Sequence, residues 1–391
     1  MRFAGIDIAS ELHVAAVVDE ACQTLVRPTP FGEDAAGYVR VRELLGTPDD
    51  VLVAMEATGH YWQNLFAVLV AEGFRVALLN PLRTHRFAGE DLRRTKTDAI
   101  DALGIASFAA QKRPPATRLP DDFTRELREL VRLRARLQQD FEDRVRHLHR
   151  LVDLGFPELS RHIRALGSEL ATTILRRYPT AHAFQDVTIR RLASLRYHER
   201  RRVGNELATT LIAAARTSVG QHHETAYQVQ VRYLCEDLDV LRQRLRDLTG
   251  DLERSLHQHQ VGTLLTSIEG IGPLTAARIV GELGDPAQFR SAAALASYVG
   301  VAPGQRHSGK RHPRSAPLSP IGHAMLRRAL WMPTLVAVRK NLWLRAYYER
   351  LRAAGKPPKV ALVAAMRKLL IAVYSVAKTR RPFVPIVPVT T

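Results

Sequence analysis

At 391 residues the chain is too long for one ordinary hydrophobic core and should divide into two or three domains. Its 57 Lys and Arg against 39 Asp and Glu leave a formal net charge of +18, which favours a polyanionic partner and above all nucleic acid. The two cysteines are far apart and argue against a disulfide framework and a zinc site, and no signal segment or membrane-spanning apolar run is visible. We therefore expect a cytoplasmic protein with no membrane partner.

The first predicted element is an apolar β-strand over residues 3–10 that carries one acidic residue, Asp7, at its centre. A short turn leads to a second apolar strand over residues 12–18, which would pair back as a hairpin. A carboxylate within an apolar strand costs several kcal/mol to desolvate unless it is paired or binds a cation. Asp7 should therefore have an electrostatic partner nearby.

Helices and strands alternate in the next part of the chain. The pattern predicts a helix over 34–45, a strand over 51–56, a helix over 60–72 and a strand over 75–81. Short loops between such elements indicate an α/β domain with a largely parallel continuation of the sheet. Glu56 ends its strand, the position at which such sheets carry chemistry.

A basic segment containing Arg94 and Lys96 leads into Asp98 and Asp101, which are three positions apart and would share one face of a helix. Taken alone, each of these two acids could be only a charge favourable to the helix dipole or a solvated neighbour. Joined to the two strand acids they make four carboxylates, which would repel one another unless cations neutralise them. Mg²⁺ suits oxygen ligands, and two such ions can assist phosphodiester cleavage.

Four short segments together resemble the DEDD transposases of the one-hundred-and-ten family of bacterial insertion sequences, which are related to the Piv-type DNA invertases. These segments are Gly5-Ile6-Asp7, Met55-Glu56-Ala57-Thr58-Gly59, Asn80-Pro81 and Lys96-Thr97-Asp98-Ala99-Ile100-Asp101-Ala102. The resemblance implies an RNase H-like, resolvase-like first domain. It also implies that a set of four acids binds Mg²⁺, with Mn²⁺ as a substitute: Asp7, Glu56, Asp98 and Asp101.

The middle of the chain is predicted to be helical. Residues 124–152 are Leu-rich without Gly or Pro, and leucines from 234 to 252 alternate spacings of four and three in a heptad seam. These two helices should pack together, antiparallel within one chain or between chains, so a homo-oligomer, a dimer or a tetramer, is expected. Between them, Arg190-Arg191 and Arg200-Arg201-Arg202 are either phosphate contacts or a solvated helical face.

The last third begins with a glycine-rich turn between two helices. Residues 267–277 have the form of a helix-hairpin-helix motif, in which Gly270 and Gly272 let backbone N–H groups approach a phosphate. The alternative is a tight turn that binds nothing. Further helices are predicted over 321–341 and 359–379.

A basic loop lies between these parts and contains Ser308 followed by Gly309. Positive surroundings lower the cost of an alkoxide and stabilise a pentavalent phosphate. In the family, the C-terminal domain supplies a nucleophilic serine. Ser308 best matches its motif, and Ser315 and Ser319 are rival candidates. The alternative without catalysis is that the Ser308 hydroxyl only contacts a phosphate. The residues expected to contact nucleic acid are basic or glycine: Arg94, Lys96, Gly270, Gly272, Arg306, Lys310, Arg311, Arg327 and Arg328.

The expected fold class is therefore α/β plus α. It comprises an RNase H-like DEDD domain over 1–115, a helical coiled-coil domain over 120–258, a mostly helical transposase domain over 259–381 and a Pro-rich tail over 382–391. The resemblance implies a DNA transposase or recombinase of an insertion sequence that acts in the bacterial cytoplasm and is associated with the nucleoid when bound to DNA.

In the implied mechanism the serine attacks a phosphodiester to form a phosphoserine, while metal ions held by the acids assist. Family members pair with donor and target double-stranded DNA through a structured noncoding bridge RNA. Two alternatives remain: a resolvase-like, metal-dependent endonuclease without a serine nucleophile, and a non-catalytic nucleic-acid-binding protein.

Overall fold

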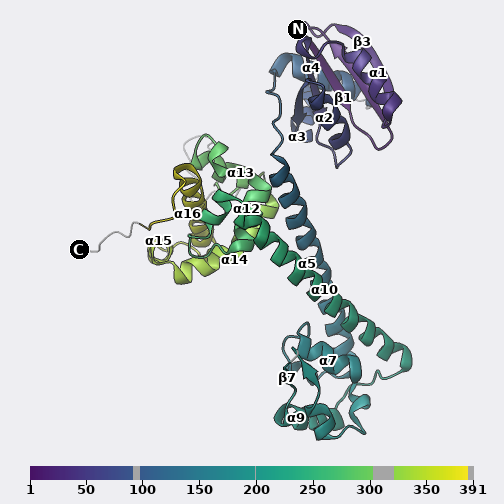
Figure 1. Cartoon of the computed structure of the whole chain (residues 1–391), viewed down its shortest axis with the longest axis vertical. Helices are drawn as coiled ribbons and strands as arrows, with labels where there is room; N and C mark the ends of the chain where they lie inside the picture. The colour runs from purple at the N-terminus through teal and green to yellow at the C-terminus, as the bar shows by residue number, and fades with distance from the viewer. Residues whose placement is uncertain (91–96, 199, 303–320, 386–391) are drawn as a thin grey trace, which may run out of the picture. The chain divides into compact units, whose positions relative to one another are not determined.

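The computed structural model describes residues 1–90, 97–198, 200–302 and 321–385 (Figure 1). The chain separates into two compact units, Met1–Leu119 and Pro120–Thr391. The first unit is built on a mixed sheet and the second is mostly helical, so the predicted combination of an α/β part with an α part is confirmed. The further division of the second unit at residue 258 stays a prediction.

The sheet of the first unit has five strands in the order β3-β2-β1-β4-β5. β1, β2 and β3 are antiparallel neighbours, whereas β4 pairs in parallel with β1 and β5 in parallel with β4. The predicted hairpin and parallel continuation are therefore confirmed. The strands are β1 (Arg2–Asp7), β2 (Leu12–Val18), β3 (Thr24–Gly32), β4 (Val51–Glu56) and β5 (Arg75–Leu79).

Two details of the predicted sheet were wrong. Asp7 is the last residue of β1 and not its centre, so this half-buried residue lies at the carboxyl end of the central strand. The edge strand β3 was not predicted, because Pro28 and Pro30 interrupt its apolar pattern. Proline is tolerated there because one side of an edge strand makes no ladder hydrogen bonds.

Helices cover both faces of this sheet. Side chains at even positions of β1 and odd positions of β4 pack against α1 and α2, and the opposite face packs against α4. Every second residue of a strand points to the same face, so this split follows from the apolar runs of β1 and β4. The helices are α1 (Ala35–Leu45), α2 (Trp62–Ala71), α3 (Pro81–Glu90), which was not predicted, and α4 (Asp98–Lys112).

The second unit is organised around a long helix pair, α5 (Asp122–Gly155) and α10 (Thr225–His257). The pair is antiparallel, because Arg134 Nε donates to Thr249 Oγ1 at 2.9 Å while Arg144 Nε lies 3.5 Å from Asp237 Oδ2. All six leucines of the predicted seam are buried. The seam is therefore packed within one chain, which is the first of the two predicted arrangements.

Two hydrophobic cores form at opposite ends of this helix pair. The first core packs the end of α5 and the start of α10 against short elements that lie between them in sequence. These are α6 (Leu159–His162), α7 (Glu169–Arg177), a 3₁₀ turn (Ala181–Phe184), α8 (Ile189–Ala193), the hairpin of β6 (Arg196–Tyr197) and β7 (Arg201–Arg202), and α9 (Asn205–Arg216). The hairpin was not predicted.

The second core packs the start of α5 and the end of α10 against the C-terminal helices. These are α11 (Gln260–Leu265), α12 (Pro273–Leu283), α13 (Ala292–Val299), α14 (Ala324–Lys340), α15 (Leu342–Ala353) and α16 (Pro358–Thr379). The separate helix α15 was not predicted. It begins where the Asn341 side chain accepts hydrogen bonds from the N–H groups of Trp343 and Leu344.

One expectation about membranes needs correction at α16. This helix is long and apolar enough to cross a membrane by length and composition, although no such run was expected. Its apolar side chains, among them Leu362, Leu369 and Val373, are buried in the second core. The helix is therefore explained by the packing of that core.

Candidate active site

Asp7 and Glu56 end two neighbouring parallel strands. The register pairs Ile6 with Met55, so the next residue on each strand brings Asp7 beside Glu56, and adjacent strands lie about 4.8 Å apart. Both acidic residues are half-buried. By alternation both side chains belong to the face that also carries Gly5, which is the face covered by α4.

Helix α4 approaches this face at the closest distance that a backbone allows. A Cβ atom added at Gly5 would lie 2.2 Å from the Ala102 carbonyl oxygen and 2.2 Å from the Ala106 nitrogen. Any larger residue at this position would push the helix off the sheet. The glycine two residues before Asp7 is therefore required for α4 to lie against β1.

The direction of α4 brings its acidic first turn to the same edge. The Arg113 guanidinium, just beyond the end of α4, lies 5.9 Å from the ring centroid of Phe3, near the start of β1. The helix therefore runs antiparallel to β1, and Asp98 and Asp101 in its first turn lie toward the end of β1 that holds Asp7. Asp98 is exposed and Asp101 is half-buried.

A buried threonine on α3 orients the Glu56 carboxylate. The Thr84 hydroxyl lies 2.5 Å from Glu56 Oε1 and donates to it. Thr84 itself is only 6% exposed. Because α3 was not predicted, this contact could not be anticipated.

The four acids fit a divalent cation by their chemistry, since carboxylate oxygens are the ligands that Mg²⁺ and Mn²⁺ prefer. Among the described residues, however, no group of three or more His, Cys, Asp or Glu side chains stands at the spacing of a metal site. The ends of β1 and β4 and the first turn of α4 thus lie at the same end of the sheet, but their four acidic side chains are not grouped at the spacing of a metal site.

A buried histidine fixes the loop that follows β1. The His13 side chain is 0% exposed; its Nδ1 accepts the Ala9 N–H at 3.2 Å, and its Nε2 lies 2.7 Å from Glu33 Oε2. Because Nδ1 accepts, the ring proton sits on Nε2 and is donated to Glu33. Burial alone would raise the pKa of Glu33, but hydrogen bonds from His13, Tyr38 and Asn64 outweigh it and lower that pKa.

Several predicted residues lie outside the described part of the chain. They are the candidate nucleophile, its two rivals and five basic residues: Ser308, Ser315, Ser319, Arg94, Lys96, Arg306, Lys310 and Arg311. The residues on either side of the segment 303–320 are described, and their positions show how the two ends of this segment are held.

The two ends of this segment meet in the second core. A Cβ atom at Gly322 would lie 2.5 Å from the Cα atom of Gly300, and both glycines have positive φ angles. The His323 N–H donates to the Tyr298 carbonyl at 3.0 Å. Arg327 donates to the Val299 backbone carbonyl at 3.3 Å, whereas Arg328 is exposed, and contact of these two arginines with nucleic acid stays a prediction.

A buried carboxylate supports this junction from α12. Glu282, whose side chain is 3% exposed, accepts two hydrogen bonds from Arg132 at 3.0 Å each, and its Oε2 lies 3.2 Å from His323 Nε2. Burial would raise the pKa of Glu282, but the bonds from His323 and Arg132 lower it to about 2. Through His323, this contact links the C-terminal end of the segment 303–320, which we name the serine segment, to α5.

The predicted glycine turn joins α11 to α12, and its two glycines differ. Gly270 has φ +103°, and a Cβ atom there would lie 2.6 Å from Ala337 Cβ, so its packing against α14 requires glycine. Gly272 is exposed at the start of α12, with nothing within 4 Å of a Cβ atom. The turn is thus confirmed as a link between helices, and its contact with a phosphate stays a prediction.

Residues 4–157 match the transposase model named for DEDD transposases of the IS110 type, and residues 262–349 match the transposase model of the IS116/IS110/IS902 family. The chain belongs to the IS110 family of transposases. It is accordingly a DNA transposase or recombinase, an enzyme that cuts and rejoins DNA strands.

Relatives of this transposase match it over most of its length. A protein of insertion element IS116 from Streptomyces clavuligerus is 29% identical over 99% of this chain and 97% of its own length. A protein of IS110 from Streptomyces coelicolor is 29% identical over 96% of this chain and 94% of its own length. The pilin gene-inverting protein of Moraxella bovis is 26% identical over 84% of this chain and 80% of its own length.

Sequence reasoning missed two polar side chains that support the segments described above, His13 in the first unit and Glu282 in the second. His13 was the one polar side chain in the apolar strand over 12–18, a signal as clear as that of Asp7. Glu282 similarly interrupts an apolar helix end. Their partners could not be identified, because Arg132 is separated from Glu282 by 150 residues.

Proposed function

We propose that the transposase cleaves and rejoins DNA with an RNase H-like acidic edge in its first unit and a serine in its second. The observation that carries this proposal is that Asp7 and Glu56 end adjacent parallel strands, on the face against which α4 brings Asp98 and Asp101. The strand order β3-β2-β1-β4-β5, antiparallel up to β1 and parallel beyond it, supports the RNase H-like assignment.

In the proposed reaction Ser308 Oγ attacks a DNA phosphorus atom. The Oγ–P bond forms, one backbone P–O bond breaks, and the released strand end takes up a proton as a hydroxyl. Rejoining reverses this step: a strand hydroxyl attacks the phosphoserine and restores the serine. The four acids would hold Mg²⁺ or Mn²⁺, which when bound stabilises negative charge on the phosphate oxygens.

The proposed partners are donor and target double-stranded DNA and a structured noncoding RNA, encountered in the bacterial cytoplasm. The net charge of +18 supports a polyanionic partner. A homo-oligomer rests on the family resemblance alone, because the leucine seam that suggested it is satisfied within one chain.

Trapping a covalent protein–DNA adduct tests the proposal. Labelled element-end DNA is incubated with the full chain, Mg²⁺ and the noncoding RNA of the element, denatured, digested and mapped for the modified serine. We expect an adduct at Ser308 that is lost in Ser308→Ala and kept in Ser315→Ala and Ser319→Ala. An adduct at either rival serine would reassign the nucleophile.

The acidic edge is tested in the same assay with two matched variants, one at the end of β4 and one just before its start. Glu56→Gln changes the acid at the end of the strand, and Asp50→Asn changes an exposed acid just before its start. We expect Glu56→Gln to lower strand cleavage by more than about a hundredfold and Asp50→Asn to leave it unchanged. Cleavage that survives Ser308→Ala but not Glu56→Gln would indicate the metal-dependent nuclease, and binding without cleavage in the wild type would indicate a pure binding protein.

A further inference from the structure

Six exposed arginines gather on one short stretch of the first core of the second unit. We name this stretch, α8 with the β6–β7 ribbon, the arginine hairpin. Among the described residues, none of the six has an acidic side chain within ion-pair distance. They are Arg190, Arg191, Arg196, Arg200, Arg201 and Arg202.

The register of the ribbon sets like charges against each other. Arg196 lies directly opposite Arg202, and Tyr197 opposite Arg201. Like charges on directly opposed residues destabilise a strand pair. The fold gains nothing from this pairing, whereas a polyanion bound across it would neutralise both charges.

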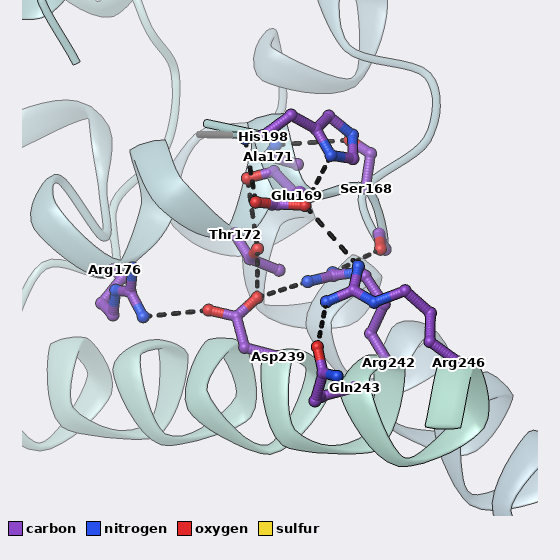
Figure 2. A network of polar contacts seen from close by, with 11 residues as sticks. Ser168, Glu169, Ala171, Thr172, Arg176, His198, Asp239, Arg242, Gln243 and Arg246 are labelled. Atoms are coloured by element: carbon purple, nitrogen blue, oxygen red, sulfur yellow. Dashed lines mark hydrogen bonds and ion pairs between the residues drawn. The ribbon is translucent and has the colours of Figure 1, made fainter. Parts of the chain in front are cut away.

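The described residues of the ribbon are nevertheless anchored at two points. At its base the Val203 N–H donates to the Leu195 carbonyl at 3.0 Å. At its turn, the backbone N–H of His198 donates to Glu169 Oε1 at 2.9 Å and the ring Nδ1 lies 2.9 Å from Glu169 Oε2 (Figure 2). His198 has a φ of +49°, which costs a non-glycine residue on the order of 1 kcal/mol or more and persists only where neighbours hold it.

The helix that carries Glu169 is fixed in turn to the long helix α10. Asp239 on α10 accepts from the Thr172 hydroxyl at 2.8 Å and from Arg176 Nη1 at 2.9 Å, both on α7 (Figure 2). Arg246, also on α10, lies 3.9 Å from Glu169. The ribbon therefore presents its arginines from a preorganised support, which lowers the entropic cost of binding.

We propose that the arginine hairpin is a docking surface for the phosphate backbone of double-stranded DNA. Arginine forks match phosphate oxygens, and a two-stranded ribbon fits the wide major groove of B-form DNA but not the narrow one of A-form RNA. This surface belongs to the first core, and the second core, which holds both ends of the serine segment, lies at the opposite end of the helix pair. Along α10, Leu234 of the first core and Leu252 of the second are about 27 Å apart at 1.5 Å per residue. It adds a DNA contact outside the proposed catalytic residues.

The test compares two triple variants of the full chain that remove the same charge. The hairpin variant is Arg196→Gln with Arg201→Gln and Arg202→Gln; the control is Arg136→Gln with Arg232→Gln and Arg244→Gln, three exposed arginines of the helix pair. Affinity is measured by fluorescence anisotropy over a salt series for a labelled 30-bp DNA of random sequence and for an RNA duplex of the same length.

We expect the hairpin variant to bind DNA at least about tenfold more weakly than the control, with a salt slope smaller by about 2 to 3, and to lose less on RNA. Its melting temperature without nucleic acid should be unchanged or higher, because Arg196 no longer opposes Arg202. Equal losses in the two variants, or a loss on RNA as large as that on DNA, would overturn the proposal. Neither result would alter the outcome of the adduct experiment.

Discussion

Each unit of the transposase supports a candidate catalytic segment with a carboxylate and a histidine, but the two carboxylates are balanced differently. In the first unit Glu33 is held by His13 and by neutral donors, and its side chain remains 23% exposed. In the second unit Glu282 is 3% exposed and carries a bidentate arginine, Arg132, besides His323. The second carboxylate is a buried charge with a countercharge, and the first is an oriented acceptor.

His13 and His323 make the same two kinds of contact, one to a backbone N–H and one to a carboxylate. Nδ1 of His13 accepts the Ala9 N–H, and Nδ1 of His323 accepts the Leu326 N–H, so each ring turns Nε2 toward its carboxylate. Because the two carboxylates differ in this way, loss of the Glu282 contacts should lower the stability of the second unit. Loss of the His13–Glu33 contact should mainly misplace the loop that follows Asp7 in the first unit.

The largest expected effect comes from removing the countercharge of Glu282. Arg132→Met leaves a buried carboxylate with His323 alone and should destabilise the second unit by about 3 kcal/mol, the lower end for a broken buried pair because Arg132 is partly exposed. Urea unfolding followed by the fluorescence of Trp331 and Trp343 measures the change. Arg136→Met, at an exposed position on the same helix, should stay within about 0.5 kcal/mol, and an equal loss in both variants would contradict the contrast.

The pH dependence of this unit should follow the same carboxylate. The folded pKa of Glu282 is about 2 against a usual value of 4.5, so its stabilising contribution is present above pH 4.5 and is lost as pH falls toward 2. The free energy of unfolding of the wild type should exceed that of Glu282→Gln by about 2 kcal/mol near pH 6, and this difference should become smaller below pH 4.5. A gap that is constant from pH 6 to pH 3 would refute the assigned charge state.

In the first unit, the same kind of change should affect catalysis more than stability. His13→Phe removes the support of the loop after Asp7 and should lower strand cleavage by about tenfold to a hundredfold, as for other groups that orient metal ligands. His13→Asn keeps an acceptor near the position of Nδ1 and should recover part of the rate. If both variants melt early and cleave equally poorly, His13 serves only the core.

The smallest expected effect concerns the clamp on the arginine hairpin. Glu169→Gln weakens a half-exposed pair with His198, so it should cost no more than about 1 kcal/mol. Hydrogen exchange in residues 196–202 should rise while exchange in α10 stays the same. Glu236→Gln, an exposed acid on α10, is the matched control, and faster exchange with this variant too would show that the clamp is not local.

Much of the fold followed from local pattern. The apolar strands that end at Asp7 and Glu56 and the leucine seam from Leu234 to Leu252 were predictable because their periodicity lies within a few neighbouring residues. The shared edge of Asp7 and Glu56 then follows from parallel pairing.

What the sequence could not reveal depends on contacts between distant residues or on weak local signals. β3 is broken by prolines, the β6–β7 ribbon has only two residues on each side, and α15 follows α14 with only Asn341 between them. The pairing of Glu282 with Arg132 spans 150 residues and leaves no local trace.

The central claim is that the acids at the ends of β1 and β4 share divalent cations, and it is tested most directly by crystals of the full chain soaked in Mn²⁺. Diffraction data at the manganese absorption edge should show an anomalous peak within coordination distance of both Asp7 and Glu56, and the peak should vanish in Glu56→Gln. Peaks only at other sites, or a peak that persists unchanged in Glu56→Gln, would contradict the account.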